Sequence, residues 1–213
     1  MATLLQANAD QWPDHAKRCD DPASLAAILM PHFNLVVWTC PDRPAVPDAD
    51  MLGEIDDIER TVAANRAAPA LVEALDAAGY PAEMIGALAR DIAAHAARLA
   101  DLVDRDNVAT RLEIVETDAC KKFHADYVSL RLILTYAGPG TQWLDQGDAA
   151  RLHDGAAIET LCVRAIPTGD VALFKGRKWA RDAPIIHRSP PIADTGQRRL
   201  VLVIDPAPNA PMP

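Results

Sequence analysis

Three side chains of the kind that bind transition metals stand in the second half of the chain. His124 and Asp126 lie two residues apart, and His187 follows 63 residues after His124. In an extended segment, residues two apart face the same side, so His124 and Asp126 present an imidazole and a carboxylate together. Two histidines and one carboxylate occupy one face of an Fe(II) ion and leave the other positions open for a cosubstrate and O2. The three residues therefore predict a non-haem iron site.

A neighbouring cysteine offers a second metal chemistry. Cys120 stands four residues before His124. Cys120, His124 and His187, completed by Asp126 or by a water, would form a tetrahedral zinc site. Cys120 is otherwise an ordinary small buried residue, and the two histidines are otherwise structural hydrogen-bonding groups. The residues alone leave iron, zinc and no metal open.

Basic and phenolic side chains near these residues are candidates for binding an acidic cosubstrate. Arg131 lies in the apolar run after Asp126, where it either reaches a carboxylate ligand or makes a cross-strand ion pair. Tyr136 ends that run and either hydrogen-bonds a bound acid or closes a strand. Arg198 and Arg199 follow His187 by 11 and 12 residues. A guanidinium suits a carboxylate because it donates two parallel charge-assisted hydrogen bonds.

The order of these motifs resembles the double-stranded β-helix core of Fe(II)/2-oxoglutarate oxygenases. An H-x-D triplet is followed by an apolar run, a glycine-led run that ends in phenylalanine, a distal histidine and an arginine. The resemblance implies that His124, Asp126 and His187 hold iron as catalytic ligands. It implies that Arg199, with Arg198 as the neighbouring alternative, binds the C5 carboxylate of 2-oxoglutarate. The expected reaction is oxidation, usually hydroxylation, of a small molecule or a protein side chain.

A closer resemblance covers most of the chain. The runs Phe123-His-Ala-Asp126, Thr135-Tyr-Ala-Gly-Pro-Gly-Thr-Gln-Trp143 and His187-Arg-Ser-Pro-Pro191 are similar to the bacterial domain-of-unknown-function family 1826. That family implies little about activity, but its association with zinc-responsive gene neighbourhoods implies an alternative. In that alternative the protein is a non-catalytic zinc-binding or metal-handling protein linked to zinc homeostasis, and Cys120 is a ligand. A metal-free ligand-binding barrel is the third possibility.

Composition excludes several other classes of protein. The 213 residues carry a net charge of −9, which argues against a nucleic-acid partner held by phosphate contacts. No apolar run reaches the ~20 residues of a membrane span, and no secretory signal is visible. Four cysteines at no disulfide-framework spacing indicate a reducing compartment. We therefore expect a cytoplasmic protein with a small-molecule or side-chain substrate and no membrane partner.

Charge and periodicity both change near residue 110. Residues 1–110 hold 18 acidic and 8 basic side chains, a net of −10, whereas residues 111–213 hold 12 and 13, a net of +1. Apolar residues at helical spacing predict helices over 51–62, 71–79 and 81–103, with a strand at 35–39 before them. After residue 110, short apolar runs separated by glycine turns predict strands over 112–115, 128–136, 158–166, 170–174, 184–187 and 199–204.

These patterns predict an α+β fold. A mainly helical region (1–110) packs on a double-stranded β-helix, a jelly-roll or cupin-like barrel (111–206), and a flexible tail (207–213) follows. We expect the helical region and the barrel to form one compact unit.

Overall fold

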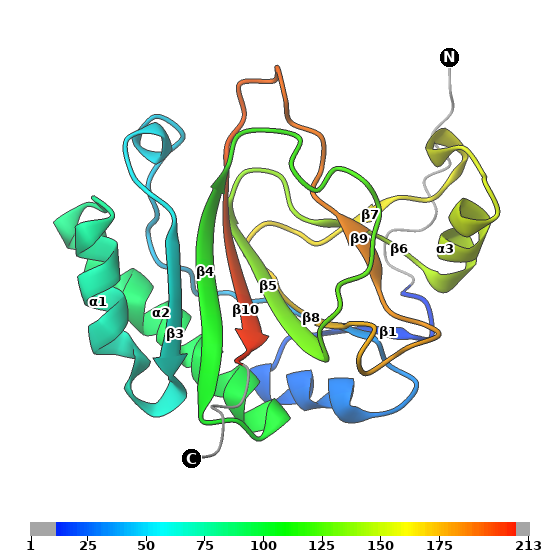
Figure 1. Cartoon of the computed structure of the whole chain (residues 1–213), viewed down its shortest axis with the longest axis horizontal. Coiled ribbons are helices and arrows are strands. Elements are labelled where there is room, and N and C mark those ends of the chain that lie inside the picture. The colour runs from blue at the N-terminus through cyan, green and yellow to red at the C-terminus, as the bar shows by residue number, and fades with distance from the viewer. Residues whose placement is uncertain (1–11, 208–213) are drawn as a thin grey trace.

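A large sheet with helices on one face and a smaller sheet on the other carries the candidate residues (Figure 1). The computed structural model describes residues 12–207. The large sheet runs in the order β1 (Ala16–Cys19), β2 (Leu35–Trp38), β8 (Val171–Lys175), β5 (Leu130–Ala137), β10 (Arg199–Pro206), β4 (Asn107–Val115) and β3 (Ile58–Ala63). The small sheet runs in the order β7 (Arg164–Ala165), β6 (Gln142–Leu144) and β9 (Ile186–Arg188). The fold is mixed α+β, as the sequence predicts.

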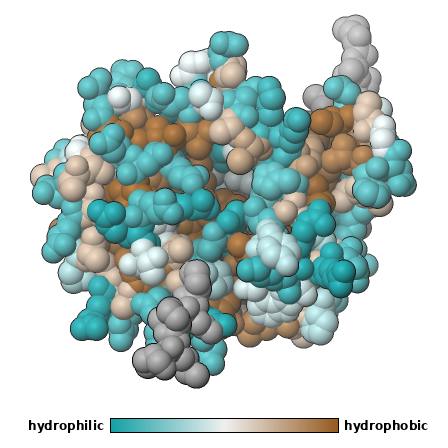
Figure 2. All heavy atoms as spheres, in the orientation of Figure 1, coloured by the Kyte–Doolittle hydropathy of each residue, from teal (hydrophilic) through white to brown (hydrophobic). Residues whose placement is uncertain are grey.

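Strand alternation divides the interior into two apolar cores. On β10, Leu200, Leu202 and Ile204 pack toward the helices, while Val201 and Val203 pack toward the small sheet. Successive side chains of a strand point to opposite faces, so one apolar strand supplies both cores. Hydrophobic residues show on the face seen in Figure 2 only as patches between hydrophilic ones. Among the described residues only six large hydrophobic side chains are exposed, and burial of the others stabilises the layered arrangement.

Two α-helices form the layer against the outer face of the large sheet. Helix α1 (Ala67–Ala77) is followed by Gly79, whose φ of 82° only glycine adopts readily. Helix α2 (Ala82–Val103) then starts directly after Pro81 and buries one apolar stripe against the sheet. The predictions of helices over 71–79 and 81–103 are confirmed to within a few residues.

The helix expected over 51–62 is wrong. Met51–Gly53 is a single 3-10 turn, and β3 follows it. Ile58 and Val62 are buried because β3 pairs with β4, which places them opposite Leu112 and Val108. A spacing of four is an even number, so it puts two residues on one face of a strand as well as on one face of a helix. Periodicity alone therefore does not distinguish a helix from a strand in this segment.

The strand expected over 158–166 is also wrong for most of its length. Ile158–Thr160 is a 3-10 turn, and only Arg164–Ala165 pairs with β6. The backbone nitrogen of Cys162 donates to the Asp148 carboxylate at 2.8 Å instead of to a neighbouring strand. Asp148 belongs to α3 (Gln146–His153), a short helix that the sequence reading missed and that Asp145 caps.

The other predicted strands are present as β2, β4, β5, β8, β9 and β10. The proposed boundary at residue 110 lies inside β4, and β1, β2 and β3 from the first half belong to the large sheet. Beyond Ala207, the predicted tail lies outside the described residues. No helix among residues 12–207 is long and apolar enough to cross a membrane.

Candidate metal centre and cavity

The main chain brings His124 and His187 together. The backbone nitrogen of His124 donates to the carbonyl of His187 at 3.0 Å, and the reverse bond is 2.9 Å. Strand β9 also pairs with β6 along its other edge, where His187 lies opposite Trp143. With Asp126, the two histidines offer donor atoms that all lie within 4.8 Å of one another. Among the described residues this is the one such cluster of histidine, cysteine and acidic side chains.

Both imidazoles are oriented by backbone carbonyls. His124 Nδ1 lies 2.9 Å from the carbonyl oxygen of Lys122, and His187 Nδ1 lies 3.4 Å from that of Ile185. A carbonyl accepts only a proton, so each Nδ1 is the donor in these contacts, and each Nε2 faces the Asp126 carboxylate. This is the arrangement in which histidine binds a metal through Nε2. The Phe174 ring packs 4.9 Å from the His187 ring and limits its rotation.

Asp126 is ionised although it is largely buried. Burial opposes ionisation, but contacts with His124 and His187 and the charge of Arg131 hold the pKa of Asp126 well below its usual range. Its Oδ1 lies 3.6 Å from His124 Nε2, while its Oδ2 lies 3.1 Å from His187 Nε2. Arg131 Nη1 is 2.7 Å from Oδ2 in an ion pair that is not a well-directed hydrogen bond. An ionised carboxylate thus stands beside the Nε2 atoms of the two imidazoles.

A separate loop holds the backbone of Asp126. The backbone nitrogens of Arg177 and Lys178 donate to the carbonyls of Asp126 and Val128, at 2.9 and 3.1 Å. Gly176 approaches this segment so closely that an added Cβ would lie 2.4 Å from the Val128 oxygen. The segment that carries Asp126 therefore depends on the loop after β8 as well as on its own sequence.

The three side chains open into a cavity of about 350 Å³ that also reaches Arg199. Arg199 is 1% exposed, and neutral oxygens surround its guanidinium. Nε donates to the carbonyl of Pro139 at 2.7 Å and Nη1 to the Ser189 hydroxyl at 2.7 Å. Nη2 donates to the hydroxyls of Thr135 and Thr141 at 3.3 and 3.1 Å.

Arg199 is thus a buried cation without a carboxylate partner among residues 12–207. Burial lowers its pKa to about 10, and the more distant Glu113 offsets only part of this. A buried charge is costly unless an opposite charge compensates it. The cavity therefore offers an anion a site that is already built, beside the His124, Asp126 and His187 cluster.

Two predicted cosubstrate ligands lie elsewhere. Tyr136 faces the helices, where its hydroxyl donates to Asp91 at 2.5 Å, because it is five residues from Arg131 and on the opposite face of β5. Arg198 pairs with Glu116 and the carbonyl of Ala49 on the surface. The structure does not bring either residue into the cavity.

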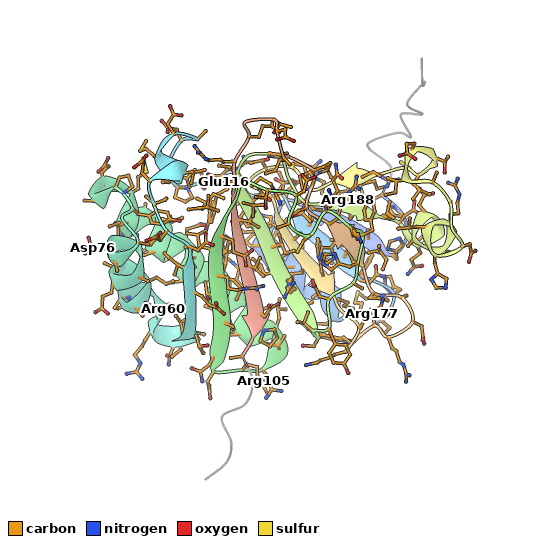
Figure 3. All side chains as sticks on the ribbon, turned by 45° about the horizontal axis from the view of Figure 1, so that its top comes forward. Arg60, Asp76, Arg105, Glu116, Arg177 and Arg188 are labelled. Carbon is orange, nitrogen blue, oxygen red and sulfur yellow. The ribbon has the colours of Figure 1, made fainter. Side chains whose placement is uncertain are left out.

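The remaining two candidates, Arg131 and Cys120, line the cavity. For Arg131 the second alternative is confirmed, because its guanidinium makes a cross-strand ion pair with Asp205 on β10. Arg131 is bound by Asp126 and by Asp205, so its donors are used within the protein. Cys120 is exposed and lines the cavity, but its thiol is not part of the metal-ligand cluster. Arg188, which Figure 3 labels, follows His187 on β9. Its guanidinium lies over the ring of Phe123, in the loop between β4 and β5.

The sequence reading missed the hydroxyls around Arg199 and the partner of Arg131. Ser189, Thr135 and Thr141 carry no motif of their own, because neutral hydroxyls occur on most surfaces. The position of Asp205, in contrast, could have been predicted from the sequence. It continues the alternation of Val201 and Val203 on β10, which places a carboxylate on the cavity side of an otherwise apolar strand.

Comparisons with solved structures find proteins of similar fold. They include a full-length Neurospora crassa protein in complex with alpha-KG, at 13% identity, 88% coverage of this chain, 79% of that chain and a TM-score of 0.45. A second is AtDAO1, dioxygenase for auxin oxidation 1 of Arabidopsis thaliana, in complex with 2-oxoglutarate. It is 13% identical, the match covers 73% of this chain and 64% of that chain, and the TM-score is 0.44. A third is AviO1 of Streptomyces viridochromogenes, which is 21% identical. Here the match covers 58% of this chain and 63% of that chain, and the TM-score is 0.34. The match spans less than two thirds of the last two proteins.

With identities below 25% and TM-scores below 0.5, these similarities carry no argument about what this chain binds or does. No curated protein is similar enough in sequence to count as a match. A family model described as "Protein of unknown function (DUF1826)" matches residues 19–205.

Proposed function

The chain belongs to the family described as Protein of unknown function (DUF1826), and we propose that it is an Fe(II)- and 2-oxoglutarate-dependent oxygenase. The observation that carries the proposal is one cavity with two features. Its lining includes the two imidazoles and the ionised carboxylate, and also the buried Arg199, which has no carboxylate partner among the described residues. A 2-oxo diacid has one end that chelates a metal and another that needs a cation.

The donor set fits iron. His124, Asp126 and His187 supply the two nitrogens and one oxygen that non-haem Fe(II) oxygenases use, and no further ligand among the described residues closes the remaining positions. A bound Fe(II) supplies the redox chemistry that couples O2 to the decarboxylation of the 2-oxo acid. The net reaction converts R–H, O2 and 2-oxoglutarate into R–OH, succinate and CO2.

The protein residues position and charge-balance the reactants. Arg199 would bind the distal carboxylate through its charge and the one Nη1 hydrogen that Pro139, Ser189, Thr135 and Thr141 leave free, and the hydroxyls of Ser189 and Thr141 would turn to donate to the same group. Apolar side chains of Ile133, Val201 and Val203 also line the cavity and would help to exclude water from it. The substrate would be a small molecule or a protein side chain.

The path of the chain supports a double-stranded β-helix. From β4 onward the chain alternates between the two sheets: β4 in the large sheet, the His124 bridge beside β9, then β5 in the large sheet. It continues through β6 and β7 in the small sheet, β8 in the large, β9 in the small and β10 in the large. This path supports the proposal of an eight-stranded jelly-roll winding whose second strand would be reduced to one bridge.

An anaerobic titration tests the proposal. Metal-stripped protein receives Fe(II) and then 2-oxoglutarate, and the visible metal-to-ligand charge-transfer band is recorded. We expect a band that needs both additions and is absent from His187→Ala. A wild-type protein that gives no band, or a His187→Ala protein that keeps it, would contradict the proposal.

The zinc-handling alternative depends on Cys120. It predicts that tightly held zinc is lost in Cys120→Ser and that 2-oxoglutarate does not bind. The position of Cys120 outside the cluster of donor atoms favours the oxygenase. Zinc content of the wild type and Cys120→Ser, measured beside the titration, separates the two functions.

A further inference from the structure

Arg131 is held rigidly between two carboxylates. On its far side, Nε and Nη2 donate to the two oxygens of Asp205 at 2.7 and 2.6 Å. On its near side, Nη1 lies 2.7 Å from Asp126 Oδ2. The side chains of all three residues are 13–16% exposed. The guanidinium therefore has no other orientation that keeps these partners.

Strand register explains why this contact is fixed. Leu132 on β5 lies opposite Ile204 on β10, so Arg131 and Asp205 are the next pair of the same ladder. A two-bond fork between facing strands defines the plane of the guanidinium as well as its position. Burial alone would lower the pKa of Arg131, but Asp205 and Asp126 raise it above its usual value, so the residue stays charged.

The fixed guanidinium of Arg131 limits how Asp126 can coordinate a metal. Charges of the same sign repel strongly at short distance in a partly buried site. His187 Nε2 lies 3.1 Å from Oδ2, but Arg131 already contacts this oxygen at 2.7 Å, so a metal ion is disfavoured there. It is favoured at Oδ1, which lies 3.6 Å from His124 Nε2. We infer that Arg131 is a positioning residue that makes Asp126 a one-oxygen ligand.

A one-oxygen ligand matters for the proposed function, on which this inference rests. An octahedral ion bound by His124, His187 and one oxygen of Asp126 keeps three positions open. A 2-oxo acid takes two of these and O2 takes one. If Asp126 used both oxygens, the cosubstrate and O2 would compete for the two remaining positions. Arg131 thus keeps a metal position open for the cosubstrate without contacting the cosubstrate itself.

The test uses Co(II) as a probe metal and 2-oxoglutarate as the ligand, under anaerobic conditions. In Arg131→Met we expect Co(II) to bind at least as tightly as in the wild type. The 2-oxoglutarate affinity of the Co(II) protein should fall about tenfold or more, in the range seen when groups behind metal ligands are removed. The visible Co(II) spectrum should change before any 2-oxoglutarate is added, which a merely structural role would not produce.

Arg111→Met is the matched control. Arg111 lines the same cavity and lies 3.6 Å from Asp205, but it has no ion pair with Asp126. Its variant should keep the wild-type spectrum and 2-oxoglutarate affinity. If Arg131→Met does not fold, Asp205→Asn replaces it, because this variant weakens the fork that fixes Arg131; the same changes are expected, only smaller.

Two failures are distinguishable. If the wild-type Co(II) protein does not bind 2-oxoglutarate, both the proposed function and the inference about Arg131 are contradicted. If the wild type binds but folded Arg131→Met, or Asp205→Asn in its place, keeps the wild-type spectrum and affinity, only the positioning role is overturned.

Discussion

The Tyr136 hydroxyl donates a hydrogen bond to the Asp91 carboxylate, 2.5 Å away, across the interface between β5 and α2. The pair lies in the core between the helices and the large sheet, on the face opposite the metal-ligand cluster. Two polar groups therefore stabilise the helical layer without taking part in the cavity.

Replacing Tyr136 by phenylalanine tests this separation. A hydrogen bond to a charged group contributes about 1.5–3 kcal/mol, and its loss leaves the buried Asp91 undercompensated. We expect Tyr136→Phe to lower the free energy of unfolding by that amount in urea denaturation. The 2-oxoglutarate affinity of the metal-loaded protein should not change. A large loss of 2-oxoglutarate binding in a folded Tyr136→Phe protein would restore Tyr136 as a cosubstrate ligand.

The same carboxylate predicts a dependence of stability on pH. Burial opposes ionisation of Asp91, but contacts with His95 and Tyr136 and the charge of Arg98 lower its pKa below the usual value, while the thiol of Cys40 lies nearby. A depressed pKa in the folded state means stability that is present at neutral pH and lost as pH falls below about 4.

Urea unfolding of the wild type and Asp91→Asn from pH 7 to pH 3 measures this contribution. The wild type should be the more stable protein at pH 7, and the difference should shrink as pH falls through about 4 toward the folded pKa. A difference between the two proteins that stays constant over this range would show that Asp91 does not titrate with a lowered pKa.

Most of the large sheet could be predicted from sequence because its strands are apolar on both faces. Strand β5 and strand β10 each bury side chains in two cores, so they read as continuous apolar runs. Strand β3 could not be separated from a helix, because its buried residues Ile58 and Val62 fit both periods. The short helix α3 was missed because the side chain of Asp145, rather than an apolar stripe, starts it.

The candidate site, like the fold, could be predicted only in part from the sequence. His124, Asp126 and His187 were identifiable because their residue types are rare together and their order is informative. Tyr136 was misplaced because the face of a side chain depends on strand parity and register, which sequence does not fix. Arg199 is the first residue of β10 and Arg198 directly precedes it, so only the point at which that strand starts to pair decides which of the two faces the cavity.

The two arginines therefore give a matched pair of variants. In Arg199→Met, the anion site loses its charge, and truncating one partner of a buried charge pair costs about 2–5 kcal/mol. We expect the 2-oxoglutarate affinity of the Fe(II) protein to fall about 30-fold or more, with metal affinity unchanged, in an anaerobic calorimetric titration. Arg198→Met should bind 2-oxoglutarate as the wild type does. Equal losses in both variants would contradict the assignment of Arg199.

Gly176 tests whether the loop after β8 positions the metal ligand. A Cβ at this residue would lie 2.4 Å from the oxygen of Val128 and 2.9 Å from that of Asp126, both backbone atoms. Gly176→Ala must therefore push the segment that carries Asp126 away from the loop. Overpacking of this kind costs about 1–3 kcal/mol of stability.

We expect Gly176→Ala to unfold at lower urea concentration and to bind Co(II) about tenfold more weakly, because Asp126 moves relative to the two histidines. Gly86→Ala is the control, since Gly86 lies within α2 and an added Cβ meets only the flexible end of Arg90, at 3.5 Å. That variant should gain about 0.5–1 kcal/mol and bind Co(II) normally. If Gly176→Ala lost stability but kept full Co(II) affinity, the loop would support the fold without positioning Asp126.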